Sequence, residues 1–154
     1  MTQRRWTIYL SGEIHSDWRE RIENGINDKD LPVDISTPIT VHEDSDDCGI
    51  AIFGQEPDKF WHDRKGAKLN AVRTKTLIES ADIVIVRFGE KFKQWNAAFD
   101  AGYATALGKP IITLHAMEHD HALKEVDAAA YAVAREAEQV VQALAYIIRG
   151  EMPA

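Results

Sequence analysis

The sequence has one cysteine, Cys48, among its 154 residues. A single cysteine excludes an internal disulfide, and without a cysteine or histidine partner at ligand spacing it is not a zinc signature. Long apolar runs are also absent, because no stretch approaches the roughly 18 residues that a membrane helix needs. The apolar run near the N-terminus is too short for a signal peptide. We therefore expect a soluble, cytoplasmic protein that has no membrane partner.

Positive charge is scarce as well. The chain has 18 Lys and Arg against 25 Asp and Glu, a formal net charge of −7, so no basic surface is expected to bind a nucleic acid polymer. A small anionic ligand is compatible with this charge, because backbone N–H groups at a helix start can hold a phosphate. Only one glycine, Gly12, follows the first predicted strand in place of a Gly-rich fingerprint, so we expect no nicotinamide or flavin cofactor.

The histidines near position 118 superficially match an inverted zinc signature, through His115, Glu118 and His119. That signature needs both histidines on one helix. Because His115 is predicted to end a strand, we interpret these histidines as ordinary surface residues. No metal and no cofactor are expected.

Alternating strand and helix patterns predict the fold. Short β-branched and aromatic runs predict strands at 6–10, 33–41, 83–88 and 109–114 and a short edge strand at 131–134, with Pro38 placing the second strand at an edge. Apolar residues at helical spacing predict helices at 16–27, 67–80, 94–107, 122–127 and 136–149, and residues 42–65 are predicted to form a long loop. Since there is no repeat or linker, we expect residues 1–154 to form a single doubly wound, flavodoxin/Rossmann-like α/β domain with about five parallel strands flanked by helices.

The ligand of such a sheet is expected at the carboxyl ends of the strands, and residues 82–110 form a strand, a loop and a helix that begin there. The predicted apolar stripe of this helix comprises Trp95, Ala98, Phe99, Gly102, Tyr103 and Ala106. An interior glycine usually marks close approach of another backbone, so Gly102 is predicted to lie against the sheet. Asp100 lies beside the stripe and is predicted to face the cleft, although an isolated aspartate is more often a solvated surface charge.

These residues carry a resemblance to a known family. Residues 81–110 resemble the nucleoside 2-deoxyribosyltransferases, and the whole chain is similar to the YtoQ family that is grouped with them. The first strand matches through TIYLSG, which contains Tyr9 and Gly12, and the later motif matches through DAGYA at 100–104 and Gly-Lys-Pro at 108–110. The match is specific in combination and weak in any single piece.

The resemblance implies an enzyme that acts on the N-glycosidic bond of a (deoxy)nucleoside or nucleoside monophosphate, by transfer or hydrolysis. Asp100 would be the nucleophile in place of the family's glutamate, and Tyr9 would orient it, although a core tyrosine is an equally open interpretation. The resemblance also implies a homo-oligomer, a dimer or larger. Gln94 and Thr74 stand where the transferases have acids, so the alternative is a non-catalytic module that binds a nucleotide derivative.

Further residues are candidates for substrate binding. Gln94 and Asn96, with Asn70 and Arg73 on the preceding helix, are candidates for contacts to the base. Ser11, Gly12, Ser16 and Arg19 surround the start of the first helix, where relatives that cleave monophosphates bind the phosphate, although a capping serine is the commoner explanation. Trp61, His62, Asp63 and Arg64 could cover the cleft as a lid or belong to an ordinary surface loop.

Overall fold

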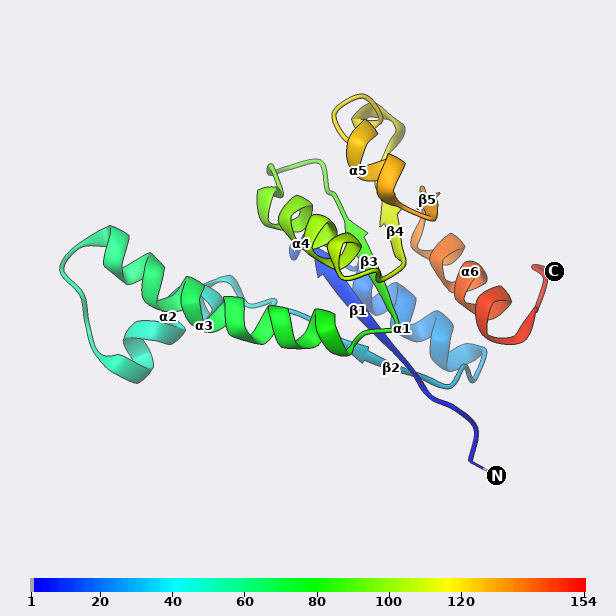
Figure 1. Ribbon diagram of the computed structural model, residues 1–154, viewed down its shortest axis with the longest axis horizontal. Helices are drawn as coiled ribbons and strands as arrows, with labels where there is room; N and C mark the ends of the chain where they lie inside the picture. The colour runs from blue at the N-terminus through cyan, green and yellow to red at the C-terminus, as the bar shows by residue number, and fades with distance from the viewer. Residues whose placement is uncertain (1) are drawn as a thin grey trace.

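The computed structural model describes residues 2–154 and contains a five-stranded parallel sheet in the order β2-β1-β3-β4-β5 (Figure 1). The strands are β1 (Trp6–Gly12), β2 (Val33–Ser36), β3 (Ile83–Arg87), β4 (Ile111–Leu114) and β5 (Ala132–Ala134). The helices are α1 (Trp18–Asp28), α2 (His42–Phe53), α3 (Lys59–Ser80), α4 (Trp95–Ala106), α5 (Lys124–Ala129) and α6 (Ala137–Arg149), with a 3-10 turn η1 (Met117–His119). The predicted α/β class and the parallel sheet are confirmed. Among residues 2–154, no helix has the length and apolar character needed to cross a membrane.

The two faces of the sheet bury different side chains, because successive residues of a strand point to opposite faces. Ile8 and Leu10 of β1 pack into one core together with residues of α1 and α6, whereas Tyr9 packs into the other with residues of α4. In Figure 1, α3 and α4 lie in front of the sheet and α1 lies behind it. Tyr9 and the next residue on its face, Ser11, therefore point toward α4.

The strand order places a topological switch point between β1 and β3. The chain runs from β1 to the edge strand β2 and then returns to β3 on the other side of β1. Open α/β sheets bind ligands in the crevice at the carboxyl ends of the two strands that flank such a point. Here those ends are Gly12 and Arg87, which are direct partners in the parallel register.

Glycine is required at the end of β1. Gly12 has a φ of +111°, and a Cβ atom built on it would lie 2.1 Å from the carbonyl oxygen of Arg87. Any side chain would therefore collide with the backbone of β3. The close approach brings the segments that follow β1 and β3 together at the switch point.

The predicted long loop at residues 42–65 is wrong. These residues form α2 and the first turns of α3, a helical hairpin that extends away from the sheet (Figure 1). A Cβ atom on Gly49 would lie 2.6 Å from the nitrogen of Gly66, and one on Gly66 would lie 2.7 Å from the carbonyl oxygen of Asp46. The two helices thus pack backbone to backbone through glycines. A contact made through glycines does not require apolar residues at helical spacing, so the sequence shows no periodic apolar pattern here.

The predicted orientation of α4 is also wrong. The buried residues of this helix are Ala97, Ala101 and Ala104, whereas Trp95 and Phe99 are each 75% exposed. Gly102, predicted to lie against the sheet, is also exposed, and a Cβ atom there would meet no atom within 4 Å. The small alanines let α4 lie close to the strands, and the large aromatic side chains point outward. The remaining predicted elements are confirmed with shifted ends, including β2 at an edge.

Candidate active site

Asp100 and Ser11 form the centre of the candidate site. Asp100 follows Ala97 by three residues and precedes Ala104 by four, so it shares the sheet-facing side of α4 with these buried alanines. Ser11 is fully buried near the carboxyl end of β1, and its Oγ donates a hydrogen bond of 2.7 Å to Oδ2 of Asp100. A buried serine therefore holds one oxygen of the carboxylate at the strand ends.

The environment of Asp100 disfavours its charged form. Burial raises the pKa of Asp100, and the hydrogen bond from Ser11 opposes this rise without cancelling it. Within residues 2–154, no Lys, Arg or His side chain forms an ion pair with Asp100. Structural carboxylates at such depth are usually paired with a cation. An unpaired carboxylate with a perturbed pKa in this position is a candidate for catalysis.

Tyr9 lies beside this carboxylate without bonding to it. The side chain is fully buried, and its hydroxyl makes no hydrogen bond to any group of residues 2–154. Burial, and after it the charge of Asp100, raises the pKa of Tyr9 to about 12, so the hydroxyl keeps its proton at neutral pH. A buried polar group without a partner costs about 1–3 kcal/mol. Thr74 lies close enough to the Tyr9 hydroxyl to oppose the rise in its pKa. Ser11, and not Tyr9, is therefore the residue that holds Asp100.

The turn from β1 to α1 is fixed by Arg19. This buried guanidinium donates hydrogen bonds to the backbone carbonyls of Leu10, Gly12 and Glu13. Burial lowers the pKa of Arg19 to about 10. Because its donors point to the chain's own carbonyls, Arg19 shapes the turn. Ser16 donates to the carboxylate of Glu13 in the same turn.

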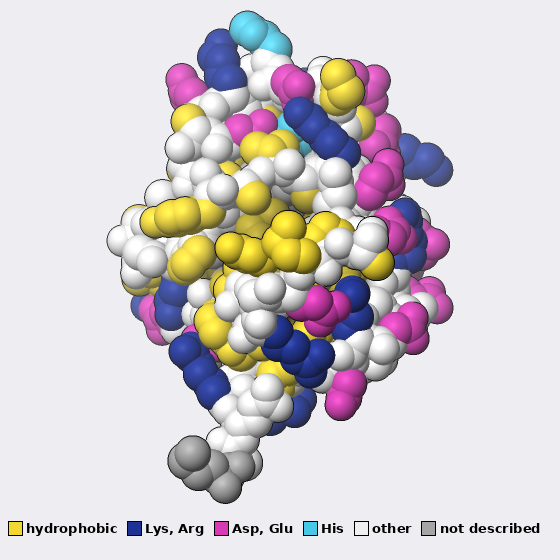
Figure 2. All heavy atoms as spheres, turned by 90° about the vertical axis from the view of Figure 1, so that its right-hand side faces the viewer, with side chains coloured by type: hydrophobic (Ala, Val, Ile, Leu, Met, Phe, Trp, Pro, Cys, Tyr) yellow, Lys and Arg dark blue, Asp and Glu magenta, His cyan; other side chains and the backbone are white. Residues whose placement is uncertain are grey.

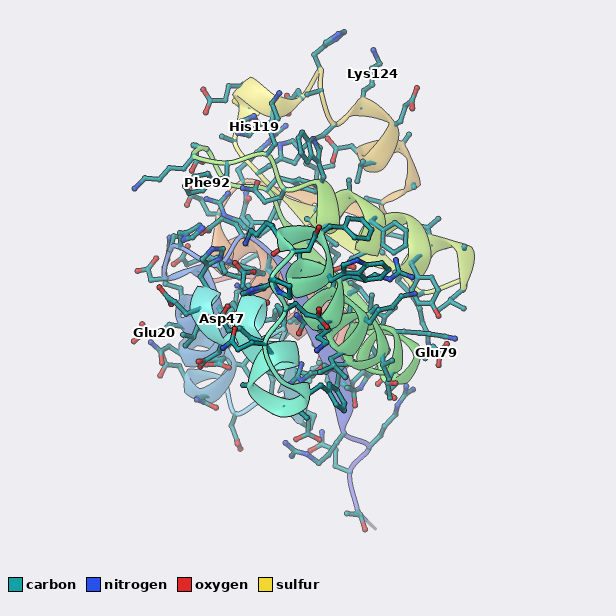
Figure 3. All side chains as sticks on the ribbon, turned by 90° about the vertical axis from the view of Figure 1, so that its left-hand side faces the viewer. Glu20, Asp47, Glu79, Phe92, His119 and Lys124 are labelled. Atoms are coloured by element: carbon teal, nitrogen blue, oxygen red, sulfur yellow. The ribbon has the colours of Figure 1, made fainter. Side chains whose placement is uncertain are left out.

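The loop between β3 and α4 crosses the strand ends toward α1. The ring of Phe92 lies 4.9 Å from the ring of His15, centre to centre. Figure 3 shows Phe92 on the same side of the molecule as Glu20 of α1, with Glu79 of α3 on the opposite side. Oε1 of Gln94 accepts a 2.8 Å hydrogen bond from the backbone N–H of Gly89, and its amide nitrogen donates to the carbonyl of Phe92. Gln94 thus braces the loop, and its amide has partners within the chain.

The candidates on α3 also have partners. Asn70 donates to the carbonyl of Ser45 at 2.9 Å, which ties α3 to α2. Arg73 donates to the carbonyl of Thr37 at 2.7 Å, in the segment that follows β2. Both side chains hold neighbouring segments against α3.

The predicted lid residues belong to the helical hairpin. His62 lies 2.9 Å from Asp47 of α2, and Asp63 pairs with Lys59 at 3.0 Å. Trp61 is 52% exposed. These side chains stand on the first turns of α3, and Asn96, on the first turn of α4, is exposed. The structure therefore brings Tyr9, Ser11, Gly12 and Asp100 together, and it places the lid candidates on a separate element.

Sequence reasoning missed Glu13. This residue is only 7% exposed and lies directly after Gly12 at the switch point. The available signal was its position, because Glu13 directly follows the turn glycine at the carboxyl end of the first strand, where a ligand is expected. A buried glutamate at the end of a strand is uncommon enough to mark a candidate.

Two groups of side chains within residues 2–154 have metal-ligand chemistry. One comprises His115, Asp120 and Asp127, and the other comprises Glu90, Glu118 and His119. His115 is fully buried, so its interpretation as a surface residue is wrong. It already bonds Asp127 at 2.8 Å, and Asp120 bonds Arg135, so the ligand atoms of the first group are engaged. In the second, both glutamates are exposed. Neither group contains Asp100.

Solved structures share this fold. A conserved protein from Enterococcus faecalis V583 superposes with a TM-score of 0.63 at 15% identity, over 92% of this chain and 98% of that one. A 2-deoxyribosyltransferase from Bacillus psychrosaccharolyticus gives 0.54 at 17% identity, over 88% and 90% of the two chains. Clostridium botulinum CMP N-glycosidase, BcmB, gives 0.51 at 17% identity, over 92% and 98%. At these identities the likeness establishes the fold.

Sequence comparison establishes the family. Residues 9–148 match the family model described as nucleoside 2-deoxyribosyltransferase YtoQ. The chain is 41% identical over 144 residues to a Bacillus subtilis (strain 168) protein described as uncharacterized protein YtoQ, covering 94% of this chain and 97% of that protein. The matched region contains the residues that the structure brings together at the candidate site, Tyr9, Ser11, Gly12 and Asp100. The chain therefore belongs to the YtoQ family of nucleoside 2-deoxyribosyltransferase-like proteins.

Proposed function

We propose that this protein is an enzyme that acts on the N-glycosidic bond of a nucleoside or nucleotide through the carboxylate of Asp100. The observation that carries the proposal is the hydrogen bond from the buried Ser11 to a carboxylate that has no cationic partner among residues 2–154. A carboxylate suits this reaction because it stabilises an oxocarbenium-like transition state and then bonds to it. The family description, and the deoxyribosyltransferase and N-glycosidase among proteins of the same fold, support this substrate class.

The proposed reaction has two steps. An oxygen of Asp100 attacks C1′ of the sugar, the C1′–N bond breaks with its electron pair leaving on the base, and the base takes up a proton from water. Water or a second base then attacks C1′ of the glycosyl ester, loses a proton to solvent and releases the carboxylate. Ser11 would fix the orientation of the carboxylate, and the buried Tyr9, which keeps its proton, would form the wall of the site beside it.

Covalent trapping tests this function directly. A 2-fluoro-2-deoxynucleoside slows the breakdown of the glycosyl ester, so the wild-type protein is expected to accumulate an adduct that peptide mass spectrometry places on Asp100. Incubation with unsubstituted nucleosides and monophosphates is expected to release free base. An unmodified Asp100, together with no base release from any of these compounds, would contradict the proposal.

A second candidate function is a binding module without catalysis. Gln94 and Thr74 favour it, because they stand where, by the resemblance, the transferases have acids. A thermal-shift screen with nucleosides and nucleotides separates the two functions. A compound that stabilises the protein and is recovered unchanged after long incubation favours the binding module.

We further propose that the protein is a homo-oligomer. Trp95 and Phe99 on the outer side of α4 are each 75% exposed. A second apolar surface surrounds β5 and α6, where Tyr131, Tyr146 and Met152 are 82%, 58% and 70% exposed, and Figure 2 shows apolar side chains gathered across this face. Large exposed apolar patches mark interaction surfaces. Since α4 carries Asp100, a second copy on the α4 surface would lie close to the candidate site.

Light scattering coupled to size-exclusion chromatography measures this assembly. The wild-type chain is expected to elute with a multiple of its 17.3 kDa mass. The double variant Trp95→Glu and Phe99→Glu is expected to shift toward the mass of one chain, because two buried charges would have to be desolvated in the interface. Tyr131→Glu tests the other surface, and a shift caused by this variant instead assigns the interface to β5 and α6. A wild-type mass of one chain contradicts the proposal.

A further inference from the structure

Glu13 occupies the crevice at the switch point. Its backbone N–H donates to the carbonyl of Arg87 at 3.1 Å, which continues the pairing of β1 with β3 beyond Gly12. The side chain lies against Gly89, where an added Cβ atom would come within 2.5 Å of Cγ of Glu13. Gly89 therefore leaves the space that the side chain of Glu13 fills.

The Glu13 carboxylate already uses the local anion-binding donors. The backbone N–H of His15 and the hydroxyl of Ser16 both donate to it, in the turn that leads into α1. Burial alone would raise the pKa of Glu13, but these hydrogen bonds and the charge of Arg87 outweigh it and lower the pKa below its usual range. The turn before a helix is where a phosphate finds N–H and hydroxyl donors. In this chain that position holds a permanent, ionised side chain.

The neighbouring cations are engaged elsewhere. Arg19 donates to three backbone carbonyls of the turn. Arg87 donates to the carbonyl of Phe88 at 3.1 Å and lies 3.5 Å from Glu90. A phosphate entering the crevice would meet the carboxylate of Glu13 without an uncommitted guanidinium to balance it. Like charges brought together in a site strongly oppose binding.

Glu13 is also within reach of a substrate bound at Asp100. Glu13 comes two residues after Ser11, which holds Asp100, so the Cα atoms of Ser11 and Glu13 lie at most about 7 Å apart. A sugar placed with C1′ at Asp100 would therefore direct one of its hydroxyl groups toward Glu13. An ionised carboxylate accepts hydrogen bonds from hydroxyl groups and offers no donor to a phosphate.

We propose that Glu13 is a specificity-determining residue that admits an unphosphorylated nucleoside, by accepting a hydrogen bond from a sugar hydroxyl, and excludes a nucleoside 5′-monophosphate. This inference rests on the proposed function for the identity of the substrate. The exclusion of phosphate from the β1–α1 turn, in contrast, depends only on the charges and donors of the turn.

Binding measurements with two kinds of probe test the inference. By titration calorimetry, the wild-type protein is expected to bind 2′-deoxynucleosides at least about tenfold more tightly than their 5′-monophosphates. Glu13→Gln keeps the shape and removes the charge, and it is expected to reverse or abolish this preference. Glu20→Gln makes the same charge change at an exposed position of α1 and is expected to leave the preference unchanged.

Inorganic phosphate is the second probe and needs no nucleoside site. In amide NMR spectra, phosphate is expected to shift the His15 and Ser16 signals of Glu13→Ala, which empties the space and frees both donors, and to leave those of the wild-type protein unmoved. Wild-type signals that shift with phosphate, or a wild-type preference for monophosphates, overturn the inference even if neither Glu13 variant folds. If the wild-type protein releases no base, but phosphate shifts the signals of the Glu13 variant and not those of the wild-type protein, the proposed function is rejected and the exclusion of phosphate stands.

Discussion

Asp100→Asn is expected to lower the rate of base release by about 10⁴-fold or more, the scale of loss when a covalent nucleophile is removed. Asparagine keeps the size of the side chain and its carbonyl oxygen can still accept the hydrogen bond from Ser11, which is 2.7 Å long in the wild-type protein. The buried surroundings of α4 therefore remain intact, and the free energy of unfolding is expected to change little or to rise, because a desolvated charge is removed. Stopped assays of free base measure the rate, and denaturant unfolding measures the stability.

Ser11→Ala is the matched control for this variant, because it leaves the carboxylate in place and removes the group that holds it. Burial raises the pKa of Asp100 and the Ser11 hydrogen bond lowers it, so loss of the bond raises this pKa further. The ionised form attacks the sugar, and activity falls as the pH drops through the pKa of Asp100. The acidic limb of the rate profile is thus expected to move to higher pH in Ser11→Ala. An Asp100→Asn protein that retains near wild-type rates would show that Asp100 is not the nucleophile.

Asp100 could be identified from the sequence because its neighbourhood in the chain is informative. A buried strand, a short loop and a helix place it at the open end of a parallel sheet, and the DAGYA motif adds the resemblance. The buried face of α4 was harder to predict. The residues at 97, 101 and 104 are alanines, which carry a weaker hydrophobic signal than Trp95 and Phe99. The large side chains therefore indicated the wrong face as the buried one.

The helical hairpin was missed for a related reason. Helix prediction from sequence depends on apolar side chains that repeat on a buried face, and α2 meets α3 through Gly49 and Gly66 instead. The large apolar residues of this segment, among them Phe53 and Phe60, are 65% and 61% exposed. The glycines and acids of this segment give it a composition typical of a loop. The need for glycine becomes clear only from the contact between the two helices.

Contacts between side chains on different elements could not be predicted from the sequence either. Ser11 and Asp100 are 89 residues apart, so their hydrogen bond depends on the register of β1 with β3 and on how closely α4 approaches the sheet. Tyr9 was expected to orient Asp100, because both residues belong to matching motifs. The structure gives this bond to Ser11 and leaves the Tyr9 hydroxyl without a partner among residues 2–154. Which of two residues on one face of a strand bonds to Asp100 depends on small differences in position, and a sequence pattern does not predict these.

Gly12→Ala is expected to lower the free energy of unfolding by at least about 3 kcal/mol, which places it among the most destabilising single substitutions. The added Cβ would lie 2.1 Å from the carbonyl oxygen of Arg87, and the φ of +111° is unfavourable for any side chain. Relief requires β1 and β3 to separate at their carboxyl ends. Urea unfolding monitored by circular dichroism gives the loss.

Two other glycines separate the causes of this loss. Gly108 has a φ of +75° with open space around it, so Gly108→Ala measures backbone strain alone and is expected to cost about 1–2 kcal/mol. Gly102 lies within α4 with no atom within 4 Å of an added Cβ, so Gly102→Ala is expected to stabilise the protein by about 1 kcal/mol. If Gly12→Ala lowers the free energy of unfolding no more than Gly108→Ala does, the added Cβ does not collide with the backbone of β3. If it costs more, the excess measures how tightly the two strand ends are held together.

Because the same two strand ends position Ser11 and Glu13, any Gly12→Ala protein that still folds is expected to lose the Ser11–Asp100 hydrogen bond and the activity that depends on it.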